Sequence, residues 1–190
     1  VRTINPDGSF ATAEYNNWTV SAINENGHRQ DSIMDAYGRL IRKEEYRGAD
    51  GRSVFYPASS YQLYAATEYA YDSEGNLVAV RDAHDHVTTI EYDHLGRKTA
   101  MDDPDMGHWE YGYDANGNLT RQIDAKGQRL DFVYDALNRL ERKDDGVSPA
   151  VTYAYDSATD ANAQGRLAAA QYGAGDQTRF FYDVLGRETQ

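Results

Sequence analysis

The pair Tyr-Asp recurs along the chain at a constant spacing, and this periodicity restricts the fold more than any other feature. Copies begin at Tyr71, Tyr92, Tyr113, Tyr134 and Tyr155, each 21 residues after the last. A period of this length indicates one supersecondary unit that is stacked many times. Because each unit of such an array contacts mainly its neighbours, function has to be sought in the array rather than in one deep core.

Large apolar or β-branched residues occupy alternate positions before each repeat tyrosine. The position two residues before it holds Tyr69, Ile90, Tyr111, Phe132 and Tyr153. This alternation predicts a strand with one buried face. The residues that follow each pair are rich in Asp, Asn, Ser and Gly, which predicts a turn and then a return strand.

One position of the repeat, four residues after the tyrosine, predicts the type of that turn. This column of the aligned repeats holds Gly75, Gly96 and Gly117, and Asn138 occupies it in the fourth copy. Both residue types tolerate positive φ, so the column predicts the left-handed residue of a hairpin turn. A second turn is predicted around an acidic residue ten positions before the next repeat tyrosine, as at Asp103. The fold class is therefore all-β, a solenoid-like spiral of stacked β-hairpins.

Departures from the period define the domain organisation. Residues 1–33 follow the pattern loosely and are interpreted as degenerate N-terminal repeats, whereas residues 34–190 form the repeat array, with Met34 in the tyrosine position. Insertions are predicted near residues 47–63 and 157–164. The first is expected to be a loop of 16 extra residues, since Met34 lies 37 residues before Tyr71 and 37 − 21 = 16.

Composition excludes several classes of function. The net charge of −12 disfavours binding to nucleic acid or to an anionic membrane surface. No apolar run is long enough to span a bilayer, so membrane insertion is not expected. The absence of cysteine removes disulfides, zinc-thiolate sites and thiol nucleophiles. Sixteen tyrosines suit a thin ribbon, because each ring buries a large area while its hydroxyl takes a polar partner.

The repeat resembles the YD repeat of the Rhs family, which is shared by bacterial polymorphic toxins, the B and C components of Tc toxin complexes and the animal teneurins. The pattern Y-D-x-x-G-R-L is matched in whole or in part by five segments, which start at Tyr71, Tyr92, Tyr113, Tyr134 and Tyr182. The resemblance implies a β-ribbon that winds into a hollow shell around an unfolded or toxic C-terminal polypeptide. It also implies a secreted or cell-surface location, reached in bacteria through a specialised secretion system.

The resemblance favours a non-enzymatic structural segment of such a shell, whose partners are the rest of the shell and the enclosed cargo polypeptide. An extracellular adhesion or carbohydrate-binding module, with a glycan or protein ligand, is the alternative. The chain starts at Val1 and stops at Gln190 within the repeat pattern, so we expect a fragment that can self-associate through open strand edges. No cofactor is expected.

The residues of the repeat columns are predicted to have structural roles. They are Tyr71, Asp72, Gly75, Tyr92, Asp93, Gly96, Arg97, Tyr113, Asp114, Gly117, Tyr134, Asp135, Arg139, Tyr155, Asp156, Tyr182, Asp183, Gly186 and Arg187. Adjacent residues of a strand point to opposite faces, so the tyrosine and aspartate of one pair cannot line one catalytic pocket without a bend. We expect the ring to pack against the next repeat and the carboxylate to accept hydrogen bonds from turn amides. No catalytic residue is predicted.

Two side-chain groups have competing interpretations. His84 and His86 have a spacing that could place two imidazoles beside a metal ion, but they fall in a turn position, so a solvated turn is the preferred interpretation. Arginines such as Arg97 and Arg139 follow the turn glycine or asparagine, and we expect them to form ion pairs with acids of neighbouring repeats.

The insertion at residues 47–63 is the strongest candidate for recognition. It contains Phe55, Tyr56 and Tyr61 in a segment that the repeat does not require. Exceptional loops on regular scaffolds often carry binding residues. The competing interpretation, a cap that covers an edge of the ribbon, stays open.

Overall fold

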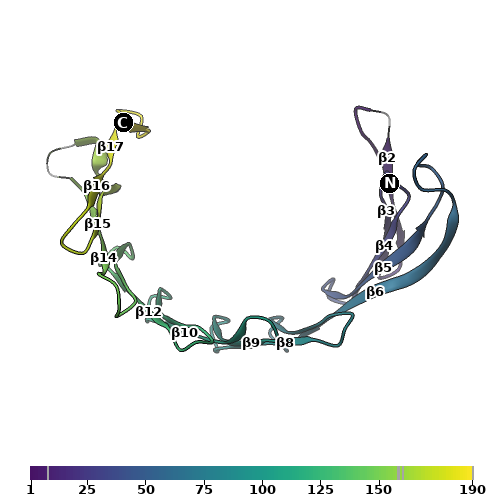
Figure 1. Ribbon diagram of the computed structural model, residues 1–190, viewed down its shortest axis with the longest axis horizontal. Helices are drawn as coiled ribbons and strands as arrows, with labels where there is room; N and C mark the ends of the chain where they lie inside the picture. Colours follow the sequence, from purple (N-terminus) through teal and green to yellow (C-terminus); the bar gives the residue numbers. More distant parts are fainter. Residues whose placement is uncertain (8, 158, 160, 190) are drawn as a thin grey trace. The chain divides into compact units, whose positions relative to one another are not determined.

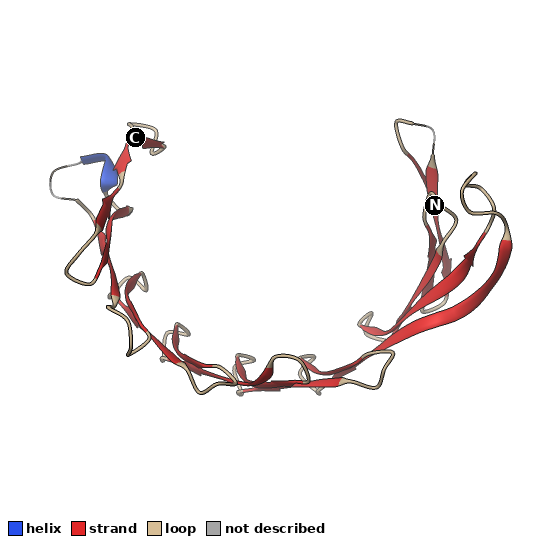
Figure 2. Cartoon of the chain, in the orientation of Figure 1, coloured by secondary structure: helices blue, strands red, loops and turns tan. Residues whose placement is uncertain are grey.

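The computed structural model describes residues 1–7, 9–157, 159 and 161–189, and it divides into two compact units, Val1–Glu91 and Tyr92–Gln190. Figure 1 gives the order of the elements, and Figure 2 shows that strands dominate both units. The predicted all-β fold of stacked hairpins is confirmed. Over the described residues, the only helical element is the short 3₁₀ turn Ala161–Ala163.

The first unit contains eight strands, the last of which ends one residue beyond it. They are β1 (Arg2–Ile4), β2 (Phe10–Asn16), β3 (Thr19–Ile23), β4 (Arg29–Met34), β5 (Leu40–Ala49), β6 (Ser59–Tyr71), β7 (Leu77–Arg81) and β8 (Val87–Tyr92). Within the unit, consecutive strands from β1 to β8 pair antiparallel. The unit is therefore a simple meander, in which sequence neighbours are also sheet neighbours.

The second unit repeats the same meander. Its strands are β9 (Lys98–Asp103), β10 (Gly107–Tyr113), β11 (Leu119–Ile123), β12 (Arg129–Tyr134), β13 (Leu140–Asp144), β14 (Val151–Tyr155), β15 (Leu167–Tyr172), β16 (Gln177–Arg179), β17 (Phe181–Tyr182) and β18 (Glu188–Thr189). Strands β9 to β16 pair antiparallel in chain order, and β17 pairs with β18 in a separate hairpin.

The predicted turn chemistry is confirmed at the repeat glycines. Gly75, Gly96, Gly117 and Asn138 have φ values of 94°, 74°, 91° and 61°. In the Gly75 turn, the amide of Gly75 donates to the carbonyl of Asp72 at 3.2 Å, and a register shift separates Ala70 from Tyr71. A residue with positive φ next to a bulge is typical of short hairpin loops, and it fixes the register of each long strand against its return strand.

The insertion near residues 47–63 is only in part the loop that the sequence predicted. Strands β5 and β6 extend into it from both sides, so that residues 47–49 and 59–63 are strand and residues 50–58 connect them, and Figure 1 shows the two strands extending together. Two register shifts interrupt their pairing, one between Glu45 and Tyr46 and one between Arg47 and Ala49. Alternating β-formers in the inserted residues allow the hairpin to lengthen, which pairs more backbone groups than a loop would. In the other insertion, residues 158 and 160 lie outside the described residues.

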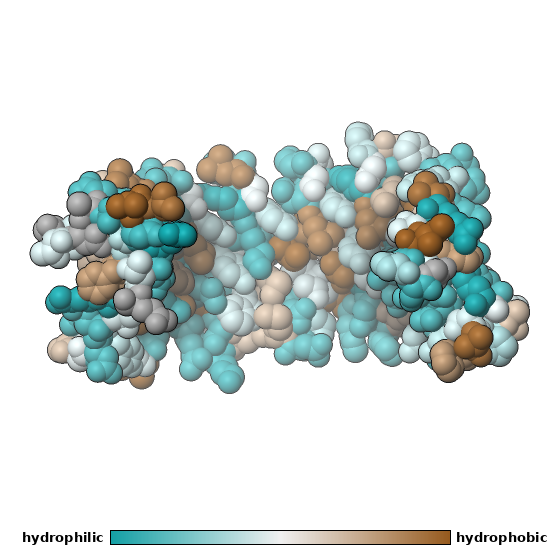
Figure 3. All heavy atoms as spheres, turned by 90° about the horizontal axis from the view of Figure 1, so that it is seen from above, coloured by the Kyte–Doolittle hydropathy of each residue, from teal (hydrophilic) through white to brown (hydrophobic). Residues whose placement is uncertain are grey.

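Neither unit has a conventional core. Among the described residues, the buried apolar side chains are Ala49 and Ala163, and the buried charged side chain is Asp31. Figure 3 shows apolar residues dispersed between hydrophilic ones over the visible face. Stability must therefore come from contacts between successive hairpins, as in other repeat proteins. No helix in the described part of the chain has the length and apolar character needed to cross a membrane.

Candidate functional site

The repeat tyrosines join each repeat to the one before it. The hydroxyl of Tyr113 donates to the backbone carbonyl of Lys98 at 2.9 Å, and Lys98 begins the return strand β9 of the preceding repeat. Equivalent bonds run from Tyr134 to Leu119, from Tyr155 to Leu140, from Tyr182 to Leu167 and, in the first unit, from Tyr71 to Leu40. The acceptor lies 15 residues earlier in the second unit. The sequence predicted that each ring packs against the next repeat, whereas the hydroxyl of each ring bonds to the repeat before it.

The repeat aspartates organise their own turns. One carboxylate oxygen of Asp93 accepts from the amides of Leu95 and Arg97 at 2.9 and 3.0 Å, and the other accepts from Arg97 Nε at 2.7 Å. The Arg97 side chain, together with these amides, lowers the pKa of Asp93 to about 2. The same pair of amide bonds occurs at Asp35, Asp114, Asp135 and Asp183. These carboxylates are engaged in the turn, which leaves them poorly placed for acid–base chemistry.

The lowered pKa of Asp93 predicts a specific dependence of stability on pH. Its pKa lies near 2 in the folded state against a reference value of 3.8, so its contribution is present above pH 3.8 and is lost as the pH falls towards 2. We expect the Asp93→Asn variant to show a smaller fall in melting temperature over this interval than the unmodified chain. Thermal denaturation at a series of pH values, followed by circular dichroism, measures this fall in melting temperature. Asp105→Asn, in an exposed turn, is the control, and an identical fall in all three proteins would contradict the prediction.

The repeat arginines differ from the sequence expectation in their ion pairs. Arg97 and Arg139 pair with the aspartate of their own turn, at 2.7 Å to Asp93 and 2.7 Å to Asp135, rather than chiefly with neighbouring repeats. The side chain that is four residues after the aspartate reaches back across the tight turn, so its own carboxylate is the nearest one. Arg139 also forms the expected cross-repeat pair, with Asp156 at 2.8 Å.

These arginines also contact the Tyr-Asp pair of the following repeat. The Arg97 guanidinium lies 4.9 Å from the ring centroid of Tyr113 and donates to the carbonyl of Asp114 at 2.9 Å. In the first unit, the Arg39 guanidinium lies 4.8 Å from the ring centroid of Tyr71. A guanidinium over an aromatic face is attracted by the ring quadrupole. Tyrosine, aspartate and arginine of successive repeats thus form an inter-repeat ladder, in which Asn118 replaces the arginine before the repeat of Tyr134.

The insertion packs on the N-terminal repeats. Tyr61 donates from its hydroxyl to the carbonyl of Gly27 at 2.6 Å, and Tyr56 lies edge-on to His28 at 4.6 Å. Phe55, in contrast, is 83% exposed. The contacts of Tyr56 and Tyr61 agree with a packing role, whereas recognition by Phe55 stays a prediction.

One face of the first unit carries a fully paired polar cluster. Asp31 is 4% exposed and pairs with Arg29 at 2.6 Å, while Tyr46 donates to Glu44 at 2.7 Å. Burial by itself raises the pKa of Asp31, but hydrogen bonds from Arg29 and Ser21 outweigh it, so that the pKa lies below its usual value. The hydrogen bond to Glu44 raises the pKa of Tyr46 to about 12. The Arg29 guanidinium also lies 5.0 Å from the ring centroid of Tyr46, which links β4 to β5, and the carboxylates of Asp31 and Glu44 are both hydrogen-bonded.

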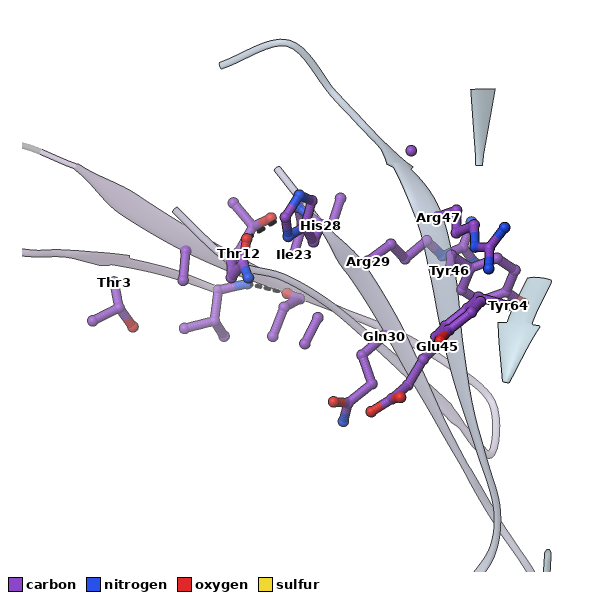
Figure 4. A pocket seen from close by; sticks show the side chains of 16 residues that line it. Thr3, Thr12, Ile23, His28, Arg29, Gln30, Glu45, Tyr46, Arg47 and Tyr64 are labelled. Carbon is purple, nitrogen blue, oxygen red and sulfur yellow. Dashed lines mark hydrogen bonds between the residues drawn. The ribbon is translucent and has the colours of Figure 1, made fainter. Parts of the chain in front are cut away.

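The same strands border a groove of about 740 Å³, whose lining includes Arg29 and Tyr46 of the polar cluster (Figure 4). Its base is a row of residues linked by the strand register: Thr3 with Ala11, Ala13 with Ala22, Ala22 with Gln30, and Gln30 with Glu45. Paired residues share a face of a sheet, and Gln30 and Asp31 are adjacent, so the side chains of Gln30 and Asp31 point to opposite faces of the sheet.

Tyr64 and Arg47 form the wall of this groove on the β5–β6 hairpin. The register passes from Glu45–Ala65 to Tyr46–Leu63, which leaves Tyr64 as the extra residue of a bulge. Bulges redirect side chains, and the ring of Tyr64 is 59% exposed with the Arg47 guanidinium 4.2 Å from its centroid. The sequence interpretation missed both residues, because it looked for recognition in the tip of the insertion. The sequence feature that could have indicated this wall is the pair of tyrosines that flanks the insertion, Tyr46 and Tyr64.

His84 and His86 lie in the turn between β7 and β8. The amides of both donate to Asp82, and His86 Nδ1 lies 3.1 Å from its second carboxylate oxygen. Both rings are mostly exposed. Among the described residues, no group of three or more His, Cys, Asp or Glu side chains could hold a metal ion.

The sequence was compared with models of known protein families and with curated protein sequences. A family model described as Teneurin YD-shell matches residues 33–190. No curated protein sequence matches the chain.

Solved structures with a similar fold include components of Tc toxins. A TcdB2-TccC3-TEV structure is 17% identical with a TM-score of 0.75, and the match covers 98% of this chain and 10% of that one. The structure of TcdB2-TccC3 without its hypervariable C-terminal region is 17% identical, with a TM-score of 0.76, and the match covers 99% of this chain and 10% of that one. The Photorhabdus luminescens Tc holotoxin pore is 16% identical, with a TM-score of 0.76 and the same two coverages. The chain thus spans about a tenth of the length of these proteins, and at such identities the likeness concerns the fold. Since the family match extends over most of the sequence, the chain belongs to the teneurin YD-shell family.

Proposed function

We propose that this chain is a non-enzymatic segment of the wall of a YD-repeat shell, which encloses a C-terminal toxin or other cargo polypeptide. The observation that carries the proposal is the inter-repeat ladder. In the repeats of Tyr113, Tyr134 and Tyr155, the hairpin is bonded to the preceding one through the tyrosine hydroxyl, and the sheet needs no second layer for this. A stable single-layered sheet is suited to a wall, because it can leave space on one side for another polypeptide.

The ladder also supports a structural rather than a catalytic role. The aspartates that recur in each repeat are occupied by turn amides and by arginine or asparagine side chains. An acid–base catalyst must instead be able to exchange a proton with a substrate. The remaining shell and its cargo would be the partners, and a toxin-like shell of this family would act outside the producing cell.

Protection of the cargo from protease tests the proposal. In the full-length protein that contains this region, we expect the C-terminal polypeptide to resist trypsin under native conditions. The double variant Tyr113→Ala and Tyr134→Ala, which removes two rungs of the ladder, should make the same polypeptide cleavable. Tyr37→Ala is the matched control, because Tyr37 is 86% exposed and its hydroxyl lies outside the ladder. Equal cleavage of the C-terminal region in all three proteins would contradict enclosure and would favour the alternative, an adhesion module without cargo.

A further inference from the structure

A separate cleft of the first unit lies over strands β5 to β8, and its floor is made of small residues. Ala70 pairs with Ala79 across β6 and β7, and Glu68 pairs with Arg81 two residues away on the same strands. Alternate residues of a strand share a face, so the two pairs lie side by side on one face of the sheet. Together they line a cleft of about 400 Å³.

The next three repeats lack this low floor. In the repeat that follows, Glu91 takes the place of Ala70. In the two repeats after that one, Arg121 and Arg142 take the place of Ala79. A long side chain at either position would occupy the space above the floor, so the cleft is a local feature of the β6–β7 hairpin.

Two apolar side chains border the floor on the flanking strands. Ile41 lies on β5, where it is left out of the pairing with β4 at a bulge. Val87 is the first residue of β8 and pairs with Arg81. The exposed fractions of Ile41 and Val87 are 36% and 37%, so both present apolar surface to a ligand in the cleft.

Two opposite charges project beside this floor without satisfying each other. Glu68 and Arg81 are directly opposite in the register of β6 and β7. Oε1 of Glu68 instead accepts a hydrogen bond from Arg42 at 2.7 Å. Arg81 lies 3.6 Å from Asp85, which is too far for a hydrogen bond. The side chains of Glu68 and Arg81 are 50% and 55% exposed, so Glu68 Oε2 and the Arg81 guanidinium are available to a ligand.

The two charges and the apolar floor together indicate the chemistry of the ligand. The planar guanidinium of Arg81 matches a carboxylate, which it can bind through two parallel hydrogen bonds. Glu68 Oε2 can accept a hydrogen bond from an ammonium group. A ligand that carries both groups is neutral overall, so the net charge of −12 does not repel it. The space above the alanine pair accommodates an apolar side chain, and its volume falls within the usual size of small-molecule sites.

We propose that this cleft binds a free apolar α-amino acid, with its carboxylate on Arg81, its ammonium group on Glu68 and its side chain above Ala70 and Ala79. This function is additional to the shell function and does not depend on it. The cleft shares no lining residue with the groove beside Tyr64.

Saturation-transfer difference NMR on the whole 190-residue chain tests the proposal with L-phenylalanine as the probe. Two analogues are the matched controls: 3-phenylpropionate lacks the ammonium group, and 2-phenylethylamine lacks the carboxylate. We expect transfer from the protein to the ring protons of phenylalanine, and binding of each analogue that is weaker by about tenfold, because each analogue loses one charged contact.

Three variants locate this binding in the cleft. Arg81→Gln and Glu68→Gln should each weaken the binding of phenylalanine by about tenfold or more. Ala79→Leu keeps both charges and fills the floor, so it should weaken the binding as well. Lys126→Gln, in an exposed turn of the second unit, removes one positive charge elsewhere and should leave the binding unchanged. Circular dichroism of each variant verifies that the fold is retained.

Several results of this experiment would overturn the proposal. They are an absence of transfer to phenylalanine, binding of either analogue that equals that of phenylalanine, and cleft variants that all bind as the unmodified chain does. Equal binding of N-acetyl-L-phenylalaninamide, which carries neither charge, would assign the cleft to an apolar side chain of a polypeptide instead. None of these results bears on the shell function, which the protease experiment tests separately.

Discussion

The Tyr113→Ala variant is expected to lose about 2–4 kcal/mol of unfolding free energy. The substitution removes a half-buried ring, the hydroxyl bond to the Lys98 carbonyl and the platform under the Arg97 guanidinium. Because the ring is partly exposed, the loss should be smaller than for a tyrosine in a closed core. Urea denaturation followed by circular dichroism gives the free energy.

Two further variants separate the contributions at this rung of the ladder. Tyr113→Phe keeps the ring and removes only the hydroxyl bond, so we expect a loss of about 1 kcal/mol. Tyr37→Ala removes a ring that is 86% exposed, and its loss should stay below about 1 kcal/mol. If Tyr37→Ala and Tyr113→Ala cost the same, the ladder would not be the source of stability.

The Gly48→Ala variant is expected to lose about 3 kcal/mol or more, because two penalties combine at this position. Gly48 has a φ of 111°, and a Cβ atom there would lie 2.6 Å from the backbone oxygen of Ser60. A backbone atom of the partner strand cannot move away without breaking the pairing of β5 with β6. The same denaturation experiment measures the loss.

Gly38→Ala is the matched control for this prediction. Gly38 has a φ of 79°, but no atom lies within 4 Å of an added Cβ. Only the conformational penalty of about 1–2 kcal/mol is then expected. Equal losses at Gly38 and Gly48 would show that the close approach of the two strands in the insertion contributes nothing.

The sequence by itself determined the repeat, its strands and its turns. The 21-residue spacing located each hairpin, and Gly75 or Asn138 identified the residue with positive φ, because few side chains tolerate that backbone conformation. Alternation at positions such as Tyr69 and Tyr71 located the long strands and the face that is half-buried. These features depend on local conformational preferences, which a single sequence carries directly. The family resemblance followed from the same columns.

Only the tertiary structure determined what the side chains contact. The acceptor of the Tyr113 hydroxyl is a backbone carbonyl, and every residue type has one, so no sequence column marks Lys98 as the partner. Arg97 could have reached several periodic acids, and the tight turn brings the carboxylate of Asp93 closest. Tyr64 borders a groove because a register shift leaves it unpaired, and register depends on the pairing of two strands rather than on either strand alone.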